Sequence, residues 1–508
     1  MRILTASDRA LLVEAADLDE AMRWNLAWRG LPGIIEQIPG ARTVLVHFDP
    51  ARTSAAALAE LLEATEPQDE HARPTGEVTI PVQYDGDDLA ETASLLGVST
   101  DALVSRHLAA HWRVAFSGFA PGFGYIIGSD PLFDVPRRLS PRTRVPAGAV
   151  ALAGPFTGVY PRESPGGWQL IGRTDAVMWD LDREPPALLV PGIAVRFQRL
   201  SADHVQLSPA AEPVEASGNR VEVIRTSLQL LVQDAGRPGR ASLGVSAFGV
   251  ADRTAMRDAN RAVGNDRGAA VLESVGGAVL RFHGEGVAVV TGAVGELAVT
   301  NRVGEVRDIV HGSPFATADG DELELGYPTR GLRCVIGIRG GVRVASALGS
   351  RSSDTLSGLG PPPLAAGDVV GVGAPPRRAV DPTVVTRELP APGDLVELSI
   401  TLGPRDDWFT ASALHTLTTQ EWLVTPRADR VGIRLQGEVP LERAVAGELP
   451  SEGAVTGAIQ VPGDGQPVLF LPDHPLTGGY PIIGALTDSC LDLAGQLPPG
   501  ARVRFRVG

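Results

Sequence analysis

The sequence predicts a mainly-β protein that begins with a small α+β unit and continues as a series of β barrels or sandwiches. Two observations on composition support this. Gly and Pro account for 59 and 41 of the 508 residues, which favours many turns and short strands over long helices. Hydrophobic residues make up 44% of the chain, enough for several cores, and the length is typical of about three to four domains. Residues 1–73 look different from the rest of the chain, which consists mainly of short β segments.

Residues 1–73 alternate strand and helix patterns. "ALLVEAA", from Ala10, is typical of a strand, and residues 17–31 show helical spacing of apolar residues behind an Asp cap. Residues 33–50 predict two strands around a Pro-Gly turn, and residues 54–67 predict a second helix with a Ser cap. The order strand, helix, strand, strand, helix is close to a ferredoxin-like split βαβ unit.

The rest of the chain predicts three β units with two connections. After a polar hinge, residues 77–207 begin with a strand and two short helices and continue as a barrel or sandwich. An Ala-, Pro- and acid-rich linker is predicted at 208–219, and a further β unit at 220–373 contains one convincing helix from Asp252 to Asn265. A Pro-rich connection at 374–394 leads to a last β unit at 395–508, with one helix expected over residues 406–422.

Charge and cysteine content narrow the possible functions. The net charge is −15, which argues against a nonspecific nucleic-acid or anionic-membrane binder. All 45 basic residues are Arg, so Schiff-base and P-loop lysine chemistry is excluded. Two cysteines form no disulfide framework, the N-terminus lacks a signal-peptide core, and no apolar run approaches 18 residues. We therefore expect a cytoplasmic protein without a membrane span.

One sequence feature occurs twice. "SPGGWQLIGRTD" (Ser164–Asp175) and "LTGGYPIIGALTD" (Leu476–Asp488) both run Gly-Gly-aromatic and then apolar-Ile-Gly, and both reach an Asp. The text before each copy is also similar. We interpret the copies as the same strand-entry bend in two related β domains, where the glycines are structural in origin and line a pocket as a consequence.

The densest candidate binding motif is "FSGFAPGFGYIIG" (Phe116–Gly128). Its glycines let backbone N–H groups approach a ligand and its aromatics form a wall, although a tight turn plugging a barrel end explains the pattern equally well. Arg side chains nearby suit a carboxylate or phosphate, or lie on the surface. The candidate substrate- or nucleotide-binding residues are Phe119, Pro121, Gly122, Tyr125, Arg144, Gly166, Gly167, Trp168, Arg237, Arg351, Thr477, Gly478, Gly479 and Tyr480.

Three acids are candidate catalytic residues: Asp234, Glu452 and Asp473. An Asp or Glu near a ligand loop serves as a general acid or base. For Asp234, in "QDAGRPG", an Asx-turn that holds the loop is the alternative. Likewise, the loop carrying Arg351 and Asp354 either cradles an anion or is pinned by an Arg–Asp pair. No metal site is predicted, because the nine histidines are scattered and the helical pair His107 and His111 lacks a third ligand.

Taken together, these motifs resemble two families. "VHFDP", "GFAPGFGYIIG", "PRTRVPAGAVALAG" and "TGVYPRESPGGWQLIGRT" resemble the family of the 5-oxoprolinase B subunit, also called KipI-like or allophanate hydrolase subunit 1. "VQDAGRPG", "ANRAVGN", "LGSRSSD", "SEGAVTGAIQVP" and "TGGYP" resemble the partner family, that of the 5-oxoprolinase C subunit, which is also called KipA-like or a biotin-dependent carboxyltransferase domain. The chain is therefore identified as a fusion of two subunits that are often separate.

The resemblance implies a ferredoxin-like domain followed by three cyclophilin-like β barrels. It implies ATP-dependent opening of 5-oxoproline to glutamate, with Mg²⁺ expected alongside ATP and with a separate A subunit of the LamB/YcsF family. Carboxyl transfer from biotin, as in urea carboxylase, and regulation of a sensor histidine kinase are the alternatives, and a homo-oligomer is compatible with each. Two departures bear on the substrate: "DHPL" (Asp473–Leu476) replaces the family's Asp-x-Gln-Thr, and "FGVAD" (Phe248–Asp252) replaces "SGAMD".

Overall fold

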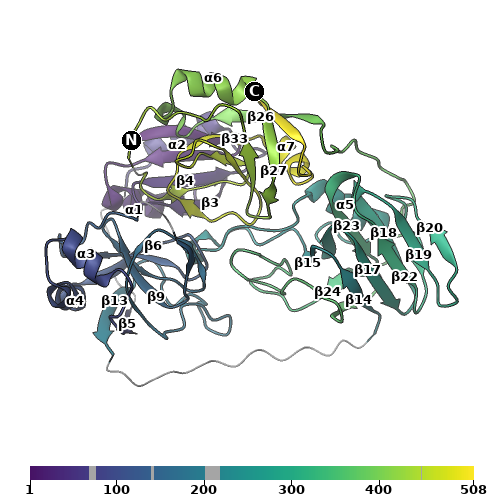
Figure 1. The fold of residues 1–508 in the computed structure, drawn as a ribbon, viewed down its shortest axis with the longest axis horizontal. Helices are drawn as coiled ribbons and strands as arrows, with labels where there is room; N and C mark the ends of the chain where they lie inside the picture. Colours follow the sequence, from purple (N-terminus) through teal and green to yellow (C-terminus); the bar gives the residue numbers. More distant parts are fainter. Residues whose placement is uncertain (68–75, 139–141, 201–217, 448) are drawn as a thin grey trace.

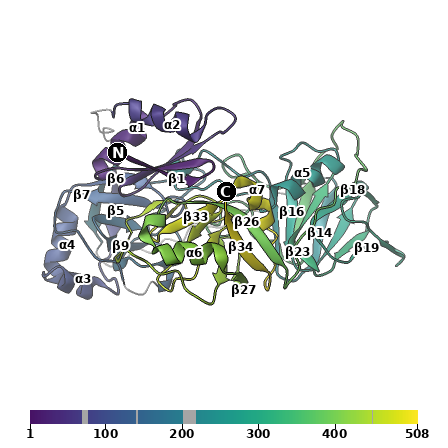
Figure 2. The ribbon, with the colours of Figure 1, turned by 90° about the horizontal axis from the view of Figure 1, so that it is seen from above.

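The computed structural model describes residues 1–67, 76–138, 142–200, 218–447 and 449–508. Most of the predicted linker at 208–219 lies outside these residues. The chain forms four units, and the C-terminal barrel lies between the other three (Figures 1 and 2). Among the described residues, no helix is long and apolar enough to cross a membrane.

The N-terminal unit is a four-stranded antiparallel sheet in the order β1-β2-β4-β3 with two helices on one face. Asp17 and Ser54 cap the two helices, as predicted, by accepting hydrogen bonds from Glu20 N and Ala57 N. Strand β1 has no counterpart in the sequence prediction because only two of its six residues are buried; it occupies the edge beside β2. The elements are β1 (Arg2–Ser7), β2 (Ala10–Glu14), α1 (Leu18–Ala27), β3 (Ile34–Pro39), β4 (Thr43–Phe48) and α2 (Ala55–Ala64).

The alternation of side chains along this sheet gives it two buried faces. Val13, Val44 and Val46 pack under the helices, while Leu12 and Leu45 on the opposite face pack against the C-terminal barrel. The N-terminal unit is thus fixed to a barrel at the other end of the chain, and β1 also contacts the first strand of that barrel, β26 (Leu395–Leu402).

The second unit is a seven-stranded sheet in the order β12-β9-β10-β7-β6-β13-β5. A bridge between Gln83 and Arg173 joins its two outer strands, so the sheet curls into a barrel. Its elements are β5 (Glu77–Val82), α3 (Leu89–Leu95), α4 (Thr100–Ala109), β6 (Trp112–Ser117), β7 (Gly124–Gly128), β8 (Arg142–Val145), β9 (Ala149–Ala153), β10 (Phe156–Val159), β11 (Ser164–Gly166), β12 (Gln169–Arg173) and β13 (Ala194–Arg199).

In the third unit, a seven-stranded sheet and a five-stranded sheet pack together around one apolar core. The predicted Asp252 cap and helix are present. Its elements are β14 (Arg220–Thr226), β15 (Gln229–Gln233), η1 (Ala241–Leu243), α5 (Arg253–Ala262), β16 (Val271–Val275), β17 (Ala278–His283), β18 (Gly286–Val294), β19 (Leu297–Thr300), β20 (Val306–Asp308), β21 (Phe315–Thr317), β22 (Glu322–Leu325), β23 (Arg330–Ile338), β24 (Val342–Arg343) and β25 (Val369–Val372).

The last unit is a closed barrel in the order β26-β33-β30-β31-β28-β27-β34. The helix predicted over residues 406–422 is shorter, because Phe409 is extended and Thr410 caps a new helix; Trp422 begins a strand. After β26, the elements are η2 (Asp406–Trp408), α6 (Ala411–Thr419), β27 (Trp422–Ala428), β28 (Gly432–Gln436), β29 (Glu452–Gly453), β30 (Ala458–Gln460), β31 (Val468–Phe470), β32 (Thr477–Gly478), β33 (Ile482–Leu486), α7 (Asp488–Ala494) and β34 (Arg502–Val507).

The second and fourth units repeat the same pattern of strands. In both, the first strand runs parallel to the last, and a helix precedes a Trp that opens the next strand. The indole N–H of Trp112 donates to His107 O at 2.8 Å, and that of Trp422 donates to Leu417 O at 3.0 Å. The two Gly-Gly segments are equivalent: each leaves a small two-stranded ladder, β8–β11 or β29–β32, and enters a barrel strand.

Candidate binding site between the two barrels

The two Gly-Gly segments meet at one cavity of about 440 Å³ between the repeated barrels. The first barrel contributes an aromatic wall and two arginines, and the C-terminal barrel contributes the second Gly-Gly segment and another arginine. The described lining residues are Phe119, Phe123, Tyr125, Arg137, Arg138, Tyr160, Pro165, Gly166, Gly167, Trp168, Arg443, Gly447, Ser451, Gln460, Pro475, Thr477, Gly478, Gly479 and Tyr480.

The aromatic wall is a packed cluster with Phe123 at its centre. The ring of Phe123 meets those of Trp168, Tyr160 and Tyr125 edge to face, with centroids 5.2–5.5 Å apart. Edge-to-face pairs of this kind stabilise by about 0.5–1.5 kcal/mol each beyond their burial. The wall is therefore a rigid surface, suited to a small flat ligand.

Thr477 couples the two halves of the cavity. Its hydroxyl accepts a hydrogen bond from Phe119 N at 3.0 Å and lies 3.1 Å from the Tyr125 hydroxyl. Phe119 has a φ of +63°, a conformation that non-glycine residues rarely adopt, at a cost of about 1–3 kcal/mol. The C-terminal barrel thus holds the strained turn of the first barrel in place.

The polar side of the cavity is cationic. Arg137 donates to Ser451 Oγ at 2.8 Å, Arg138 donates to Asp88 at 2.7 Å, and Arg443 donates to Val461 O at 2.6 Å. The Nε atoms of Arg138 and Arg443 are buried without a hydrogen-bond partner. Burial lowers the pKa of Arg443, whose guanidinium lies over the Tyr480 ring. The described lining contains no carboxylate and no imidazole, so the cavity is suited to a small anion.

The glycines of the paired segments leave space that side chains would fill. A Cβ at Gly166 would clash with the Tyr160 ring and hydroxyl, and one at Gly479 would clash with the end of the Arg137 guanidinium. At Gly478 a Cβ would lie 2.8 Å from Gln460 Nε2. Gly166 requires glycine because a rigid ring approaches it closely, whereas a Cβ at Gly478 or Gly479 would displace only the end of a flexible side chain. This is consistent with the interpretation that the segments are bends that also line a pocket.

Glu452, a predicted acid, lies behind the cavity in a buried ion pair. Its carboxylate receives Arg405 Nη2 at 2.6 Å and Nε at 3.0 Å, and both residues are buried. Arg405 also pairs with Glu14 of the N-terminal unit. Glu452 stands opposite Gly478 in the β29–β32 ladder, so the pair fixes the second Gly-Gly segment and ties three elements together.

The first barrel has an equivalent ion pair, Arg142–Asp88, in which the acid and the base have exchanged positions relative to Arg405–Glu452. Arg142 stands opposite Gly166 in the β8–β11 ladder and makes two hydrogen bonds, at 2.6 and 2.8 Å, to Asp88. Asp88 N donates to Leu170 O, as Arg405 N donates to the equivalent Ile482 O, each at 2.9 Å. Although burial opposes it, hydrogen bonding from Arg142 holds the pKa of Asp88 below its usual range. An acid on one barrel thus takes the place of a base on the other.

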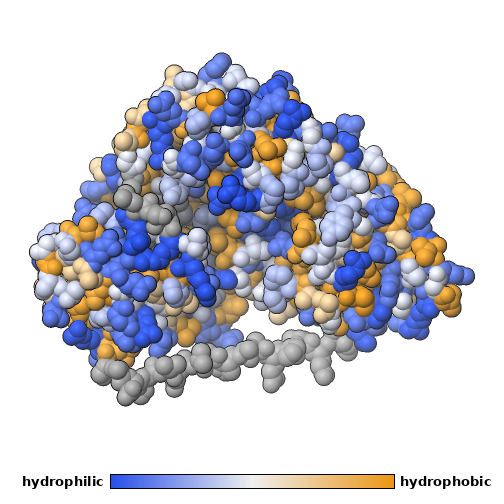
Figure 3. Space-filling model, in the orientation of Figure 1, coloured by the Kyte–Doolittle hydropathy of each residue, from blue (hydrophilic) through white to orange (hydrophobic). Residues whose placement is uncertain are grey.

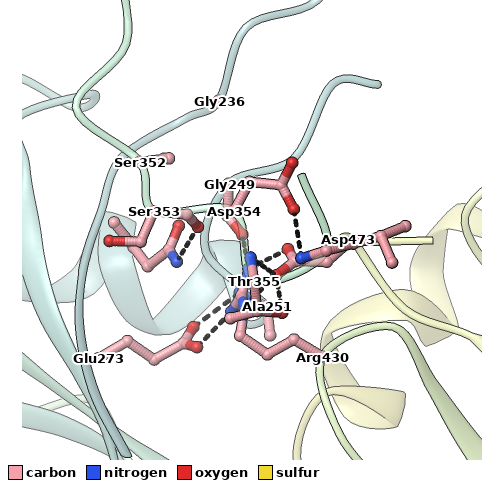
Figure 4. Close-up of polar contacts among 12 residues, drawn as sticks. Gly236, Gly249, Ala251, Glu273, Ser352, Ser353, Asp354, Thr355, Arg430 and Asp473 are labelled. Carbon is pink, nitrogen blue, oxygen red and sulfur yellow. Dashed lines mark hydrogen bonds and ion pairs between the residues drawn. The ribbon is translucent and has the colours of Figure 1, made fainter. Parts of the chain in front are cut away.

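Asp473 belongs to a second buried polar cluster, at the junction of the third unit and the C-terminal barrel (Figure 4). Arg430, fully buried, donates to Asp473 at 2.9 and 3.1 Å and pairs with Glu273 on its other side. Asp473 also accepts hydrogen bonds from Thr355 N and Oγ1 at 2.9 and 2.7 Å. Because both carboxylate oxygens are occupied by internal donors, this residue fixes how the two units dock.

Asp234 and its neighbours form the loop side of the same junction. The Asp234 carboxylate accepts hydrogen bonds from Gly236 N, Ser350 Oγ, Ser352 Oγ and the backbone N–H of Arg351, at 2.6–2.9 Å. This is the Asx-turn arrangement, with the opposite loop pinned to it. Arg237 is buried against the Phe248 ring, and the Arg351 side chain donates to Val344 O. Within the described part of the chain, no ion pair forms between Arg351 and Asp354, whose carboxylate accepts from Leu356 N.

Two family models match this chain. Residues 243–507 match the model for the carboxyltransferase domain, subdomains A and B, and residues 1–189 match the model for the carboxyltransferase domain, subdomains C and D. The first match alone spans more than half of the chain. The chain belongs to the carboxyltransferase-domain family.

Relatives of this carboxyltransferase-domain protein cover its two halves. The B subunit of 5-oxoprolinase from Escherichia coli O157:H7 is 40% identical over 180 residues, 34% of this chain and 83% of that protein. The C subunit from Escherichia coli K12 is 30% identical over 289 residues, 56% of this chain and 90% of that protein. Urea amidolyase of Saccharomyces cerevisiae is 29% identical over 309 residues, 56% of this chain but 16% of that protein. The chain is thus a B–C fusion, as the motifs predicted.

One solved structure matches this domain organisation from end to end. The crystal structure of TTHA0988 covers 98% of this chain and 99% of its own, at 34% identity and a TM-score of 0.83. The predicted mainly-β architecture with barrels is therefore confirmed, and the arrangement of units in this carboxyltransferase-domain protein is shared by another fused chain.

The cavity gathers most, though not all, of the predicted binding residues. Those that line it are Phe119, Tyr125, Gly166, Gly167, Trp168, Thr477, Gly478, Gly479 and Tyr480. Pro121 and Gly122 lie on the turn behind the wall, where Gly122 N donates to Leu243 O of the third unit. Arg144 is exposed and pairs with Glu163, while Arg237 and Arg351 lie at the other junction.

Sequence reasoning missed the three arginines of the cavity. Arg137 and Arg138 lie just before "PRTR", whose residues Arg142 and Arg144 were considered as anion-binding residues instead. The high density of arginines in this segment could have indicated all four. Arg443 lies in "LERAV", which carries no signal at all. His107, which shares a helix face with His111 and was not predicted to bind a metal, is buried between Tyr84 and Thr157. No group of three metal-binding side chains occurs within the described ranges.

Proposed function

We propose that this chain is the combined B and C component of an ATP-dependent 5-oxoprolinase, which opens the lactam of 5-oxoproline to glutamate with a separate A subunit of the LamB/YcsF family. Support comes first from the relatives, which match both halves. The observation that carries the proposal is the cavity itself: three guanidinium groups, an aromatic wall and no acid among the described lining residues.

The cavity suits the two functional groups of 5-oxoproline. Its carboxylate would pair with one of the three arginines that line the cavity. The flat lactam ring would lie against Trp168 and Tyr160, and its amide would meet polar groups such as Gln460. In this proposal the chain binds and orients the substrate and excludes water from it.

Lactam opening also needs proton transfer, because water attacks the carbonyl carbon and the ring nitrogen leaves as an amine. The described lining supplies no carboxylate or imidazole for this. The proposal therefore assigns proton transfer to the separate A subunit. It assigns positioning to Asp234, Glu452 and Asp473, whose carboxylates are occupied by internal partners. In this division of roles, turnover requires the second protein.

ATP would activate the lactam by transferring its γ-phosphoryl group to the lactam oxygen, which releases ADP. Attack of water and cleavage of the C–N bond would then leave an acyl phosphate, and a second water would hydrolyse it to glutamate and phosphate. The described residues contain no cluster of acids or histidines that fits Mg²⁺. In this proposal the magnesium that accompanies ATP would be held by the nucleotide, by water and by the second protein.

Two measurements test the proposal. Calorimetry should show that the purified chain binds 5-oxoproline and does not bind 2-pyrrolidinone, which has the same lactam without the carboxylate. ATP hydrolysis should rise on adding 5-oxoproline only when the A subunit is present. If the assembled proteins show no turnover that depends on 5-oxoproline, the substrate assignment is wrong, whatever the binding result.

Carboxyl transfer from biotin is a second candidate, favoured by the match to carboxyltransferase models. Biotin is carried on a lysine, and this chain has none, so the carrier would be another protein. A biotinylated protein that copurifies with the chain, and bicarbonate-dependent carboxylation in its presence, would favour this function over lactam hydrolysis.

A further inference from the structure

Strand β20 forms an exposed edge of the third unit. It is the outermost strand of the seven-stranded sheet, and among the described residues its only strand partner is β19. Val306 is 66% exposed, and the neighbouring Val303 and Val310 are 79% and 65% exposed. Figure 3 shows hydrophobic residues at this outer margin, and Figure 1 shows β20 away from the other units. An apolar open edge is a template for another strand.

The hydrogen bonds to β19 fix which groups of β20 point outward. Asn301 N donates to Glu305 O at 3.0 Å, and Ile309 N donates to Leu297 O at 3.1 Å, on either side of the Val299–Arg307 pair. In an antiparallel ladder bonded and free positions alternate along a strand. The odd-numbered residues therefore bond to β19, and Val306 and Asp308 direct their N–H and C=O groups away from the sheet.

Charge then selects one register for pairing with an identical strand. Centring the pair on Val306 sets Glu305 opposite Arg307 twice and matches the outward groups of Val306. A strand pair centred on Glu305 would place two glutamates opposite each other. One centred on Arg307 would do the same with two arginines, and one centred on Asp308 with two aspartates. Of these registers, only the one centred on Val306 combines correct hydrogen-bond phase with attraction between unlike charges.

We propose that the chain forms a symmetric dimer by antiparallel pairing of β20 with β20 of a second copy, centred on Val306. The two seven-stranded sheets then become one continuous sheet. The exposed valines at the centre of the contact lose their contact with water, and the cavity between the barrels stays open, because it lies in other units of the chain.

Cross-linking tests the register. Residues opposite each other at a bonded position have Cα atoms about 5.5 Å apart, within disulfide range. Val306→Cys should form a disulfide-linked dimer under mild oxidation, seen on a non-reducing gel, whereas wild type and Val303→Cys should not. The two native cysteines are absent from this edge, being buried and half-buried. Equal cross-linking of Val303→Cys and Val306→Cys, or none at either, would overturn the register.

Charge exchange tests the contact without a cysteine. Glu305→Arg and Arg307→Glu should each weaken dimerisation by more than about tenfold in sedimentation equilibrium, because like charges then face each other. The double variant Glu305→Arg/Arg307→Glu should recover most of the loss, since the pair is only reversed. A wild-type mass of 53.2 kDa at every concentration would refute the dimer. Single and double variants that behave alike would refute the pairing.

Discussion

The buried Arg405–Glu452 pair allows a decisive test of whether Glu452 is structural. In Glu452→Gln the carboxylate charge is lost while the shape is kept, and Arg405 retains Glu14 as its remaining ionic partner. Breaking a buried pair by neutralising one member typically costs about 3–5 kcal/mol. Since Glu14 still offsets part of the guanidinium charge, we expect the lower end of that range, about 3 kcal/mol.

Scanning calorimetry measures this loss. The pair joins the N-terminal unit to the C-terminal barrel, which together are comparable to a domain of about 150–250 residues, for which each kcal/mol lowers Tm by roughly 2–4 °C. We therefore expect Glu452→Gln to lower the Tm of the unfolding transition that includes these two units by roughly 6–12 °C. Ligand binding below that transition should persist, because Glu452 does not line the cavity.

The matched control is Glu163→Gln, which removes an exposed partner of Arg144. Exposed pairs contribute about 0–1 kcal/mol, so its Tm should stay close to that of the wild type. A Glu452→Gln protein with unchanged Tm and no turnover in the assembled enzyme would contradict the structural assignment and restore Glu452 as a catalytic acid.

Three further predictions concern the cavity and the core. Arg443→Gln should weaken binding of small carboxylates by about tenfold or more in calorimetry with little change in Tm, because it removes a cationic group from the cavity lining; unchanged affinity would remove Arg443 from the site. Gly166→Ala should lower Tm more than Gly479→Ala, because the first clashes with a buried ring and the second with the end of a long side chain; the reverse order in a thermal melt would count against the close-approach argument. Burial lowers the pKa of His107 to about 3, so the unfolded chain binds a proton below about pH 6.5 that the folded chain does not, and stability should fall as pH drops from about 6.5 towards 3. His107→Gln should flatten that part of the stability–pH curve; an unchanged slope would mean that His107 is already charged in the fold.

Local signals predicted the elements whose causes are local. Asp17, Ser54 and Asp252 cap helices where the sequence placed them, because capping depends on residues three positions away. The helix over residues 406–422 was placed with the wrong bounds, since the cap at Thr410 competes with the earlier start at Asp406. Strand β1 was missed because only two of its six residues are buried and its packing on the C-terminal barrel is tertiary.

The candidate site divides in the same way. The Gly-Gly and aromatic motifs indicated a pocket because a close approach to the backbone favours glycine and a rigid pocket wall favours aromatic residues. The sequence could not show that both Gly-Gly segments line one cavity, since that depends on how two barrels far apart in the chain dock. Nor could it separate a carboxylate facing a ligand from one facing an arginine. Asp234, Glu452 and Asp473 are all conspicuous as acids, and each is occupied by internal partners.

The two barrels are alike in their strands but differ in one ion pair each. The residue opposite the Gly-Gly segment is a base in the first barrel (Arg142, paired with Asp88) and an acid in the C-terminal barrel (Glu452, paired with Arg405). Because the two barrels share one pattern of strands, the β11 and β32 segments have similar shapes and similar partners. If the two segments exchanged places with their ladders, Asp88 would face Glu452 and Arg405 would face Arg142. Each such contact opposes like charges at a buried site, where two uncompensated charges cost several kcal/mol. The native pairing instead places an acid against a base in both barrels. The same ion pairs that hold the Gly-Gly segments at the cavity therefore also specify which segment belongs to which barrel.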